Sequence, residues 1–261
     1  MSRPDAHNCW NARMSEELIQ VYEELETYSH VRAIVLTGDP AGKCFCAGAD
    51  LNQHNFSTRA QNLNISETES RDRGGQVALP IQRSRKITIA AINGNAAGIG
   101  ITMTLPMDLR FAWKDAKIAF PFVRRGIVPE ATSTYHLPLL IGRSRAMAVL
   151  LQGAPIPASS PLLNGLFTKL LDTTESVLPY ALEIAHELST RTSPTSIAFT
   201  KALVLNAKPT AEEQHILDSR AMFVTGNGDA KEGVRSYLEK RPPRFDDYDT
   251  RALPDWLKAK I

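Results

Sequence analysis

The hydrophobic positions in the first half of this chain follow two different periods. Over residues 12–28, apolar side chains recur every three or four residues, a spacing typical of an amphipathic helix. These side chains belong to Met14, Leu18, Val21, Tyr22, Leu25 and Tyr28. Residues 31–37 and 87–92 are instead apolar with almost no alternation, which indicates strands covered on both faces. Two shorter strands are predicted at 109–112 and 117–120.

The pattern changes after residue 132, where helical periodicity takes over. We expect helices at 143–151, 158–164, 174–190, 194–206, 210–225 and 229–239. An alternation of strands and helices followed by helices alone predicts an α/β protein with a helical annex. The polar stretch 52–76 interrupts the alternation, and we expect it to form an excursion over a pocket.

Composition and charge narrow the function classes without choosing one. A chain of 261 residues can bury a large core, as one domain or two smaller ones. Its 30 basic and 28 acidic residues give a net charge of +2, which argues against nucleic acid or a membrane surface as the main partner. No apolar run approaches the roughly 18 residues of a membrane span, and the first residues are polar and unlike a signal peptide.

The cysteines indicate the redox environment. Cys9, Cys44 and Cys46 are odd in number and have no His or Cys partner at metal-ligand spacing. We therefore expect reduced thiols in an intracellular protein and no metal site.

Two glycine-bearing segments carry the candidate chemistry. Residues 46–50 read CAGAD and residues 93–100 read NGNAAGIG, and each segment follows an apolar, β-branched run. Small residues at the end of a strand let the backbone approach a ligand and leave amide N–H groups free to donate to a developing negative charge. Neither segment matches a phosphate loop or a complete dinucleotide fingerprint. The two segments predict one anion-stabilising site, and the alternative is two tight turns after strands.

Five motifs in the same order resemble those of the enoyl-CoA hydratase/isomerase (crotonase) superfamily. They are RPDAHN at 3–8, FCAGADL at 45–51, AINGNAAGIG at 91–100, MDLR at 107–110 and the stretch 120–138, with Gly153 and the NGL at 164–166 downstream. The resemblance covers nearly the whole chain. It is strongest to the peroxisomal Δ3,Δ2-enoyl-CoA isomerase branch and to its fungal members.

This resemblance implies the fold and the assembly. The expected fold is the crotonase (ClpP-like) α/β spiral of ββα units, with a C-terminal helical region used in trimerisation. The core would cover residues 1–190, with shortened N-terminal strands, and the helical region would cover 191–261. The family resemblance further implies a homotrimer or a dimer of trimers, no nucleic-acid or membrane partner, and no cofactor or metal. Coenzyme A would enter only as part of an acyl-CoA substrate.

The resemblance also assigns an oxyanion hole, formed by the backbone N–H groups of Ala49 and Ile99. These donors would bind the thioester carbonyl of the substrate. Removal of a proton alpha to a thioester gives an enolate, whose oxygen such donors stabilise as the charge arrives. The positions expected to bind the substrate are Cys46, Ala47, Gly48, Asp50, Leu51, Gly98, Phe122 and Val128.

The choice of reaction depends on carboxylates. Hydratases of this family use two glutamates, and the corresponding positions here hold Thr102 and Phe122. Residues 120–130 resemble the isomerase branch instead, whose single catalytic glutamate corresponds to Glu130. Glu130 would move a proton from C2 to C4 of a 3-enoyl-CoA through a dienolate, and an apolar pocket that raises its pKa would favour this role. The alternative role for Glu130 is to cap the following helix.

Two other functions stay open at this point. One is a diverged crotonase-fold hydratase, dehydratase or thioester hydrolase of secondary metabolism, and the other is a non-catalytic acyl-CoA-binding protein. The last three residues, Ala259-Lys260-Ile261, resemble a relaxed Ser-Lys-Leu address. We therefore expect a peroxisomal protein of fatty acid β-oxidation, and otherwise a cytoplasmic one.

The remaining polar residues are predicted to have structural roles. We expect Asp50 to hold its loop, Asp108 to fix a turn and His136 to pack within a helix. Cys46 lacks a visible activating partner for nucleophilic catalysis. A late basic cluster is expected to be a solvated face, with coenzyme A phosphates as the alternative partner; it consists of Arg235, Lys240, Arg241 and Arg244.

Overall fold

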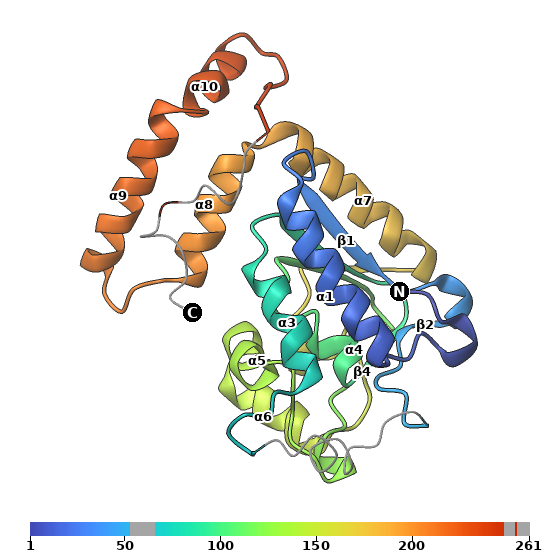
Figure 1. Ribbon diagram of the computed structural model, residues 1–261. Coiled ribbons are helices and arrows are strands. Elements are labelled where there is room, and N and C mark those ends of the chain that lie inside the picture. The colour runs from blue at the N-terminus through green and yellow to red at the C-terminus, as the bar shows by residue number, and fades with distance from the viewer. Residues whose placement is uncertain (53–65, 248–253, 255–261) are drawn as a thin grey trace. The chain divides into compact units, whose positions relative to one another are not determined.

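The apolar runs form strands of two four-stranded sheets in the computed structural model, which describes residues 1–52, 66–247 and 254 (Figure 1). The chain divides into two compact units. The first consists of Met1–Tyr22, Val35–Arg83 and Thr88–Leu182, and the second of Glu23–Ile34, Ser84–Ile87 and Glu183–Ile261. The expected peroxisomal address at 259–261 and residues 53–65 of the expected excursion lie outside the described residues. The boundary at residue 190 stays a prediction.

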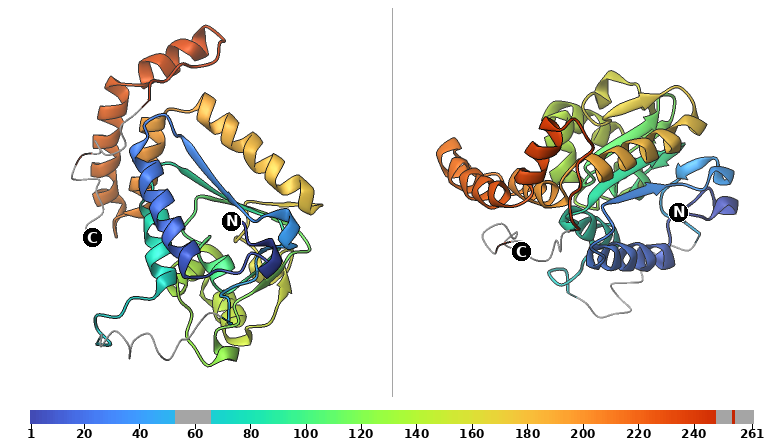
Figure 2. Two further views of the ribbon diagram at one scale, coloured as in Figure 1. Left: turned by 45° about the vertical axis from the view of Figure 1, so that its right-hand side comes forward. Right: turned by 90° about the horizontal axis from the view of Figure 1, so that it is seen from above.

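The first sheet contains the strands predicted from the apolar runs at 31–37 and 87–92. Its strand order is β1-β3-β5-β8, and β3 pairs in parallel with β5, as β5 does with β8. The strands are β1 (Ala33–Thr37), β3 (Ile87–Ile92), β5 (Leu109–Trp113) and β8 (Lys169–Leu171). All six residues of β3 are buried, so the prediction of a strand covered on both faces is confirmed. The right-hand view of Figure 2 shows these strands side by side.

The second sheet carries the glycine-bearing segments. Its order is β2-β4-β6-β7, in which β2 and β4 are parallel neighbours. The strands are β2 (Cys44–Cys46), β4 (Asn95–Ala97), β6 (Lys117–Ala119) and β7 (Ile156–Pro157). Parallel strands end at the same edge of a sheet, so the residues after β2 and those after β4 lie at one edge.

Helices surround these sheets, and most of the predicted ones are confirmed. They are α1 (Ala12–Thr27), α3 (Arg73–Arg83), α4 (Ile99–Thr102), α5 (Ser133–Ile141), α6 (Arg143–Gln152) and α7 (Thr174–Arg191), with 3-10 turns at Pro4–Ala6, Pro40–Gly42, Val123–Arg125 and Pro161–Leu163. As predicted, α1 buries one face, which includes Met14, Leu18 and Tyr22. Over the described ranges, no helix has both the length and the apolar character needed to cross a membrane.

One predicted element is wrong, and another ends earlier than predicted. The predicted helix at 158–164 is only the short 3-10 turn Pro161–Leu163, whose first residue lacks an N–H and whose turn is capped by Ser160 Oγ. The expected excursion at 52–76 gives way to α3 at Arg73. The sequence pattern did not predict the start of this helix, because Gly74 and Gly75 lie there and glycine is unfavourable in a helix.

The C-terminal helices of the second unit are α8 (Pro194–Leu205), α9 (Ala211–Asn227) and α10 (Ala230–Leu238) (Figure 1). Two of them begin at side-chain caps, since Ser193 Oγ accepts from the amide of Ser196 and Thr210 Oγ1 accepts from that of Glu213. A small cluster of Ala198, Phe199, Ala202 and Ala221 joins α8 to α9.

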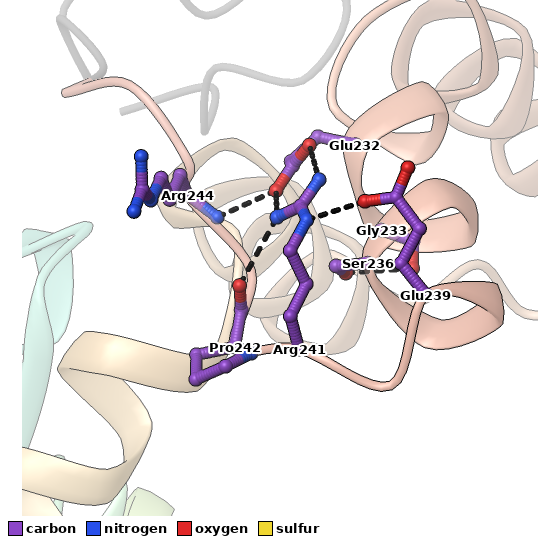
Figure 3. A network of polar contacts seen from close by, with 7 residues as sticks. All are labelled: Glu232, Gly233, Ser236, Glu239, Arg241, Pro242 and Arg244. Carbon is purple, nitrogen blue, oxygen red and sulfur yellow. Dashed lines mark hydrogen bonds and ion pairs between the residues drawn. The ribbon is translucent and has the colours of Figure 1, made fainter.

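The predicted basic cluster, which lies in α10 and directly after it, contains an ion pair (Figure 3). The guanidinium of Arg241 binds both carboxylate oxygens of Glu232, at 2.6 and 2.9 Å, and its Nε donates to Glu239 at 2.6 Å. The backbone amide of Arg244 also donates to Glu232, at 2.7 Å. These donors lower the pKa of Glu232 to about 2. Arg241 is therefore bound to neighbouring carboxylates, whereas Arg235, Lys240 and Arg244 are exposed, as expected for a solvated face.

Arg110 is a buried charged residue of the first unit. It lies in β5, and its Nε donates to the carbonyl of Leu166 at 2.8 Å. Its Nη1 lies 2.5 Å from the carbonyl oxygen of Met107 and 3.2 Å from those of Thr104 and Leu105. Burial lowers the pKa of Arg110 to about 10, so the side chain is still charged at neutral pH. Arg110 thus joins the turn before β5 to the segment before β8.

That turn is also held by Asp108, as predicted. Its Oδ2 accepts from the amide of Thr88 at 2.7 Å and from the hydroxyl of Thr88 at 2.9 Å.

We predict that Arg110→Met lowers the free energy of unfolding by at least about 3 kcal/mol, because it leaves several buried carbonyls without a donor. Urea denaturation followed by circular dichroism measures the change. Lys114→Ala is the control, since it breaks only the exposed ion pair with Asp172 and should leave stability nearly unchanged. Equal effects of the two substitutions would contradict the role assigned to Arg110.

Candidate active site

The register of β2 and β4 brings two backbone amides to the same edge of the sheet. Cys46 of β2 pairs with Ala96 of β4, and the strands run in parallel. Three residues beyond each member of this pair are Ala49 and Ile99. The equal offset places both amides just past the end of neighbouring strands.

A glycine in the left-handed region precedes each of these amides. Gly48 has a φ of +100° and Gly98 has a φ of +51°. Side chains rarely adopt these angles, so glycine is required where each strand turns. The two turns therefore follow from the two glycines that the sequence pattern emphasised.

The hydrogen bonds around Ala49 determine the direction of its N–H group. On one side of Ala49, the amide of Trp10 donates to Gly48 O, and on the other the amide of Asp50 donates to Trp10 O. Ala49 lies between these bonds and directs its own N–H to the opposite side. Within the described ranges, neither the Ala49 amide nor the Ile99 amide donates to a protein acceptor. Two free donors at one edge can bind an oxygen that carries negative charge.

Close packing holds the two segments together. A Cβ atom on Gly100 would lie 2.3 Å from the carbonyl oxygen of Cys46, closer than real Cβ contacts allow. The first turn of α4 thus lies directly on the end of β2. Gly100 is glycine because there is no room for a side chain.

The glycine-bearing segment at 46–50 does not supply a nucleophile. Cys46 is fully buried, and burial raises the pKa of its thiol to about 12, so little thiolate exists at neutral pH. Asp50 forms an ion pair with Arg3 at 2.9 Å and accepts from the amide of Asn52 at 3.2 Å. These bonds confirm the predicted role of Asp50 in holding its loop. The ion pair to Arg3 was not predicted, because 47 residues separate the partners.

Glu130 lies next to α4. The hydroxyl of Thr102, the last residue of α4, donates to Glu130 Oε1 at 2.7 Å. Burial raises the pKa of Glu130 to about 7, with a further contribution from the charge of Asp72, while the Thr102 hydroxyl opposes the shift. The direction of the shift is the one expected for a carboxylate in an apolar pocket.

The backbone after Glu130 is unusual. Ala131 and Thr132 both have a φ of +55°, in the left-handed region that side chains disfavour. The carbonyl of Glu130 accepts from the amide of Ser133 at 3.0 Å and from its hydroxyl at 2.6 Å. Thr132 is the N-cap of α5, so the Glu130 side chain does not cap this helix, and the alternative role for it is wrong.

Helix α3 supports the Glu130 segment. Asp72 Oδ1 accepts from the amide of Gly75 at 2.5 Å and from the amide of Ala131 at 3.1 Å. A Cβ atom on Gly74 would lie 1.4 Å from Glu130 Oε2, so the helix contacts the carboxylate through a glycine. Sequence reasoning missed Asp72 and Gly74. The available signal was an aspartate three residues before Gly75, at an N-cap position.

The other residues predicted to bind the substrate differ in how exposed they are. Phe122 is buried, whereas Leu51 is 60% exposed and Val128 is 79% exposed. Val128 therefore does not line the buried surroundings of Glu130. His136 is buried in α5, where burial and the charge of Arg110 lower its pKa, so it is a neutral packing residue at neutral pH, as expected.

The described part of the chain contains no group of three or more His, Cys, Asp or Glu side chains arranged to hold a metal ion. The arrangement consists instead of two free amides and one largely buried carboxylate. Such a set can stabilise an enolate and move a proton.

Comparison with known proteins places this geometry in a family. The profile described as Enoyl-CoA hydratase/isomerase matches residues 1–248. Enoyl-CoA hydratase AFT3-1 of Alternaria alternata is 42% identical over 248 residues, which cover 95% of this chain and 81% of the relative. The 1,2-epoxyphenylacetyl-CoA isomerase of Escherichia coli (strain K12) is 31% identical over 248 residues, which cover 94% of this chain and 92% of that protein.

Comparison with solved structures identifies the same family. The crystal structure of a probable enoyl-CoA hydratase/isomerase from Mycobacterium abscessus matches with a TM-score of 0.85 at 31% identity, and the match covers 95% of this chain and 94% of that one. The chain therefore has the crotonase fold and belongs to the enoyl-CoA hydratase/isomerase family.

Proposed function

We propose that this protein isomerises a 3-enoyl-CoA to the 2-trans form, with Glu130 as the base and the Ala49 and Ile99 amides as the oxyanion hole. The observation that carries the proposal is a single carboxylate with a pKa near 7, hydrogen-bonded to α4, whose first amide is free. Membership of the family supports an acyl-CoA thioester as the substrate.

The chemistry needs one group that can both take and return a proton. Glu130 takes the proton from C2, and the electron pair of the broken bond spreads over the dienolate to the thioester oxygen. The proton then returns at C4, which leaves the double bond between C2 and C3. A carboxyl with a pKa of about 7 suits both steps at neutral pH. Each amide donor to the enolate oxygen is worth about 3 kcal/mol in the barrier.

Water addition is the second candidate function, because similar fungal relatives such as AFT3-1 are named enoyl-CoA hydratases. One observation favours isomerisation over hydration. By the family resemblance, the positions of the two hydratase glutamates hold Thr102 and Phe122, which are not acids or bases at neutral pH.

A homotrimer or a dimer of trimers forms part of the same proposal. Helices α8, α9 and α10 expose large apolar side chains. Monomeric soluble proteins rarely expose many such side chains together, and surfaces of this kind commonly mark sites of protein association. The exposed apolar side chains of these helices are Val204, Leu205, Ile216, Met222, Phe223, Val224, Val234, Tyr237 and Leu238. This set supports the C-terminal helices as an association surface.

The first prediction from this proposal concerns the reaction. We expect the wild-type protein to convert a 3-enoyl-CoA, measured by the ultraviolet absorbance of the conjugated thioester, and Glu130→Gln to lower kcat by at least about 100-fold. Glu175→Gln, at an exposed position in the first turn of α7, is the control and should retain activity. Hydration of a 2-enoyl-CoA that survives Glu130→Gln would select the hydratase, and tight acyl-CoA binding without turnover would select a binding protein.

The second prediction is a pH dependence of stability. Glu130 has a pKa of about 7 in the folded protein, against 4.5 as its usual value, so the folded state binds more protons between these limits. The contribution of Glu130 to stability is therefore greatest below pH 4.5 and falls as the pH rises through 7. Glu130→Gln should raise the free energy of unfolding at pH 8 by up to about 3 kcal/mol. Urea denaturation at pH 8 and at pH 4 tests this, and an equal gain at both values would contradict it.

The third prediction concerns Gly74. A Cβ atom at this position displaces the Glu130 carboxylate, so Gly74→Ala should lower kcat by about 100-fold. Gly226→Ala in α9 is the matched control, because its Cβ atom meets nothing within 4 Å. Unchanged kcat in Gly74→Ala would show that the reacting carboxylate lies elsewhere.

A further inference from the structure

The hydroxyl of Thr102 has two acceptors within reach. Its Oγ1 lies 2.7 Å from Glu130 Oε1 and 3.2 Å from the carbonyl oxygen of Gly98. A threonine hydroxyl carries one proton, so it donates to one of these acceptors at a time. Thr102 is fully buried, where a change of hydrogen-bond partner has more effect than it would have in water.

The Gly98 carbonyl and the Ile99 N–H belong to the same peptide unit. The carbonyl oxygen already accepts from the amides of Ile101 and Thr102, both at 3.0 Å. A further donor to this oxygen polarises the peptide and makes its N–H a stronger donor, since hydrogen bonds in a chain reinforce one another. The Thr102 hydroxyl can supply that donor.

We infer that Thr102 couples the protonation of Glu130 to the donor strength of the Ile99 amide, through the Gly98 carbonyl. This inference rests on the function proposed above. It makes Thr102 a positioning residue that acts through other groups and does not touch the substrate.

The coupling follows the movement of charge. While Glu130 is ionised, its charge-assisted bond attracts the Thr102 hydroxyl. When the C2–H bond breaks, the proton forms an O–H bond on Glu130 and the electron pair moves toward the thioester oxygen. The neutral carboxyl is a weaker acceptor, so the hydroxyl turns to Gly98 O. The Ile99 amide thus becomes a stronger donor as negative charge reaches the oxygen that it binds.

A simpler role for Thr102 is to orient Glu130 and adjust its pKa. The two roles separate in a Glu130→Gln background, because glutamine is a neutral analogue of the protonated acid and has no pKa to adjust. An effect of Thr102 on the oxyanion hole that persists in this background does not depend on the pKa of Glu130, as expected if it passes through the Gly98 peptide.

The experiment measures enolate binding without turnover. A β-ketoacyl-CoA is titrated into the protein, and its enolate is followed by near-ultraviolet absorbance. Thr102→Val removes the hydroxyl and keeps the shape, whereas Thr102→Ser keeps the hydroxyl and is the matched control. We expect Thr102→Val to weaken enolate binding about two- to fivefold, both with Glu130 and with Glu130→Gln, and Thr102→Ser to restore it. Thr102→Ala repeats the test if the valine variant does not fold, as judged by thermal unfolding.

Three outcomes overturn the inference. One is an effect of Thr102→Val that vanishes in the Glu130→Gln background, and another is a serine variant that behaves like the valine variant. The third is a wild-type protein that forms no enolate with the probe. Enolate binding that depends on Thr102 in a protein that does not isomerise 3-enoyl-CoA would instead support the coupling and reject the proposed function.

Discussion

The parallel pairing of β2 with β4 is the constraint on which the candidate site depends. Strand β2 is only three residues long, and glycines surround it. A Cβ atom on Gly38, Gly94 or Gly100 would lie 2.5 Å, 3.0 Å and 2.3 Å, respectively, from the backbone of β2. Any larger residue at these positions would separate the strands. The distance between the Ala49 and Ile99 amides is thus set by backbone packing, with little dependence on side chains.

The Glu130 carboxylate lies in surroundings that disfavour its ionised form. Burial disfavours the ionised form of Glu130, and the residues that follow it occupy left-handed backbone conformations. Asp72 fixes the amide of Ala131, and Thr102 binds the carboxylate itself. The surrounding structure therefore maintains an arrangement that the segment would not adopt alone, as is common where function requires it.

The sequence predicted those features that depend on local pattern. The nearly continuous apolar run of β3 identified a strand covered on both faces. The two glycine-bearing segments indicated one anion-stabilising site, and the family resemblance assigned Ala49 and Ile99 as its donors. The role of Glu130 as a base was predicted from the resemblance, and burial raises its pKa in the direction that such a role requires.

The features that the sequence did not predict depend on contacts between distant parts of the chain. Asp72 and Ala131 are 59 residues apart, and Thr102 and Glu130 are 28 residues apart. No local periodicity signals such pairs. The burial of a charged Arg110 among carbonyls, and the close contact of Gly74 with Glu130, likewise exist only in the folded chain.

The burial of the cysteines affects how fast their thiols are oxidised. Burial raises the thiol pKa not only of Cys46 but also of Cys9 and Cys44. Peroxide oxidises the thiolate form, so all three sulfur atoms react slowly with it.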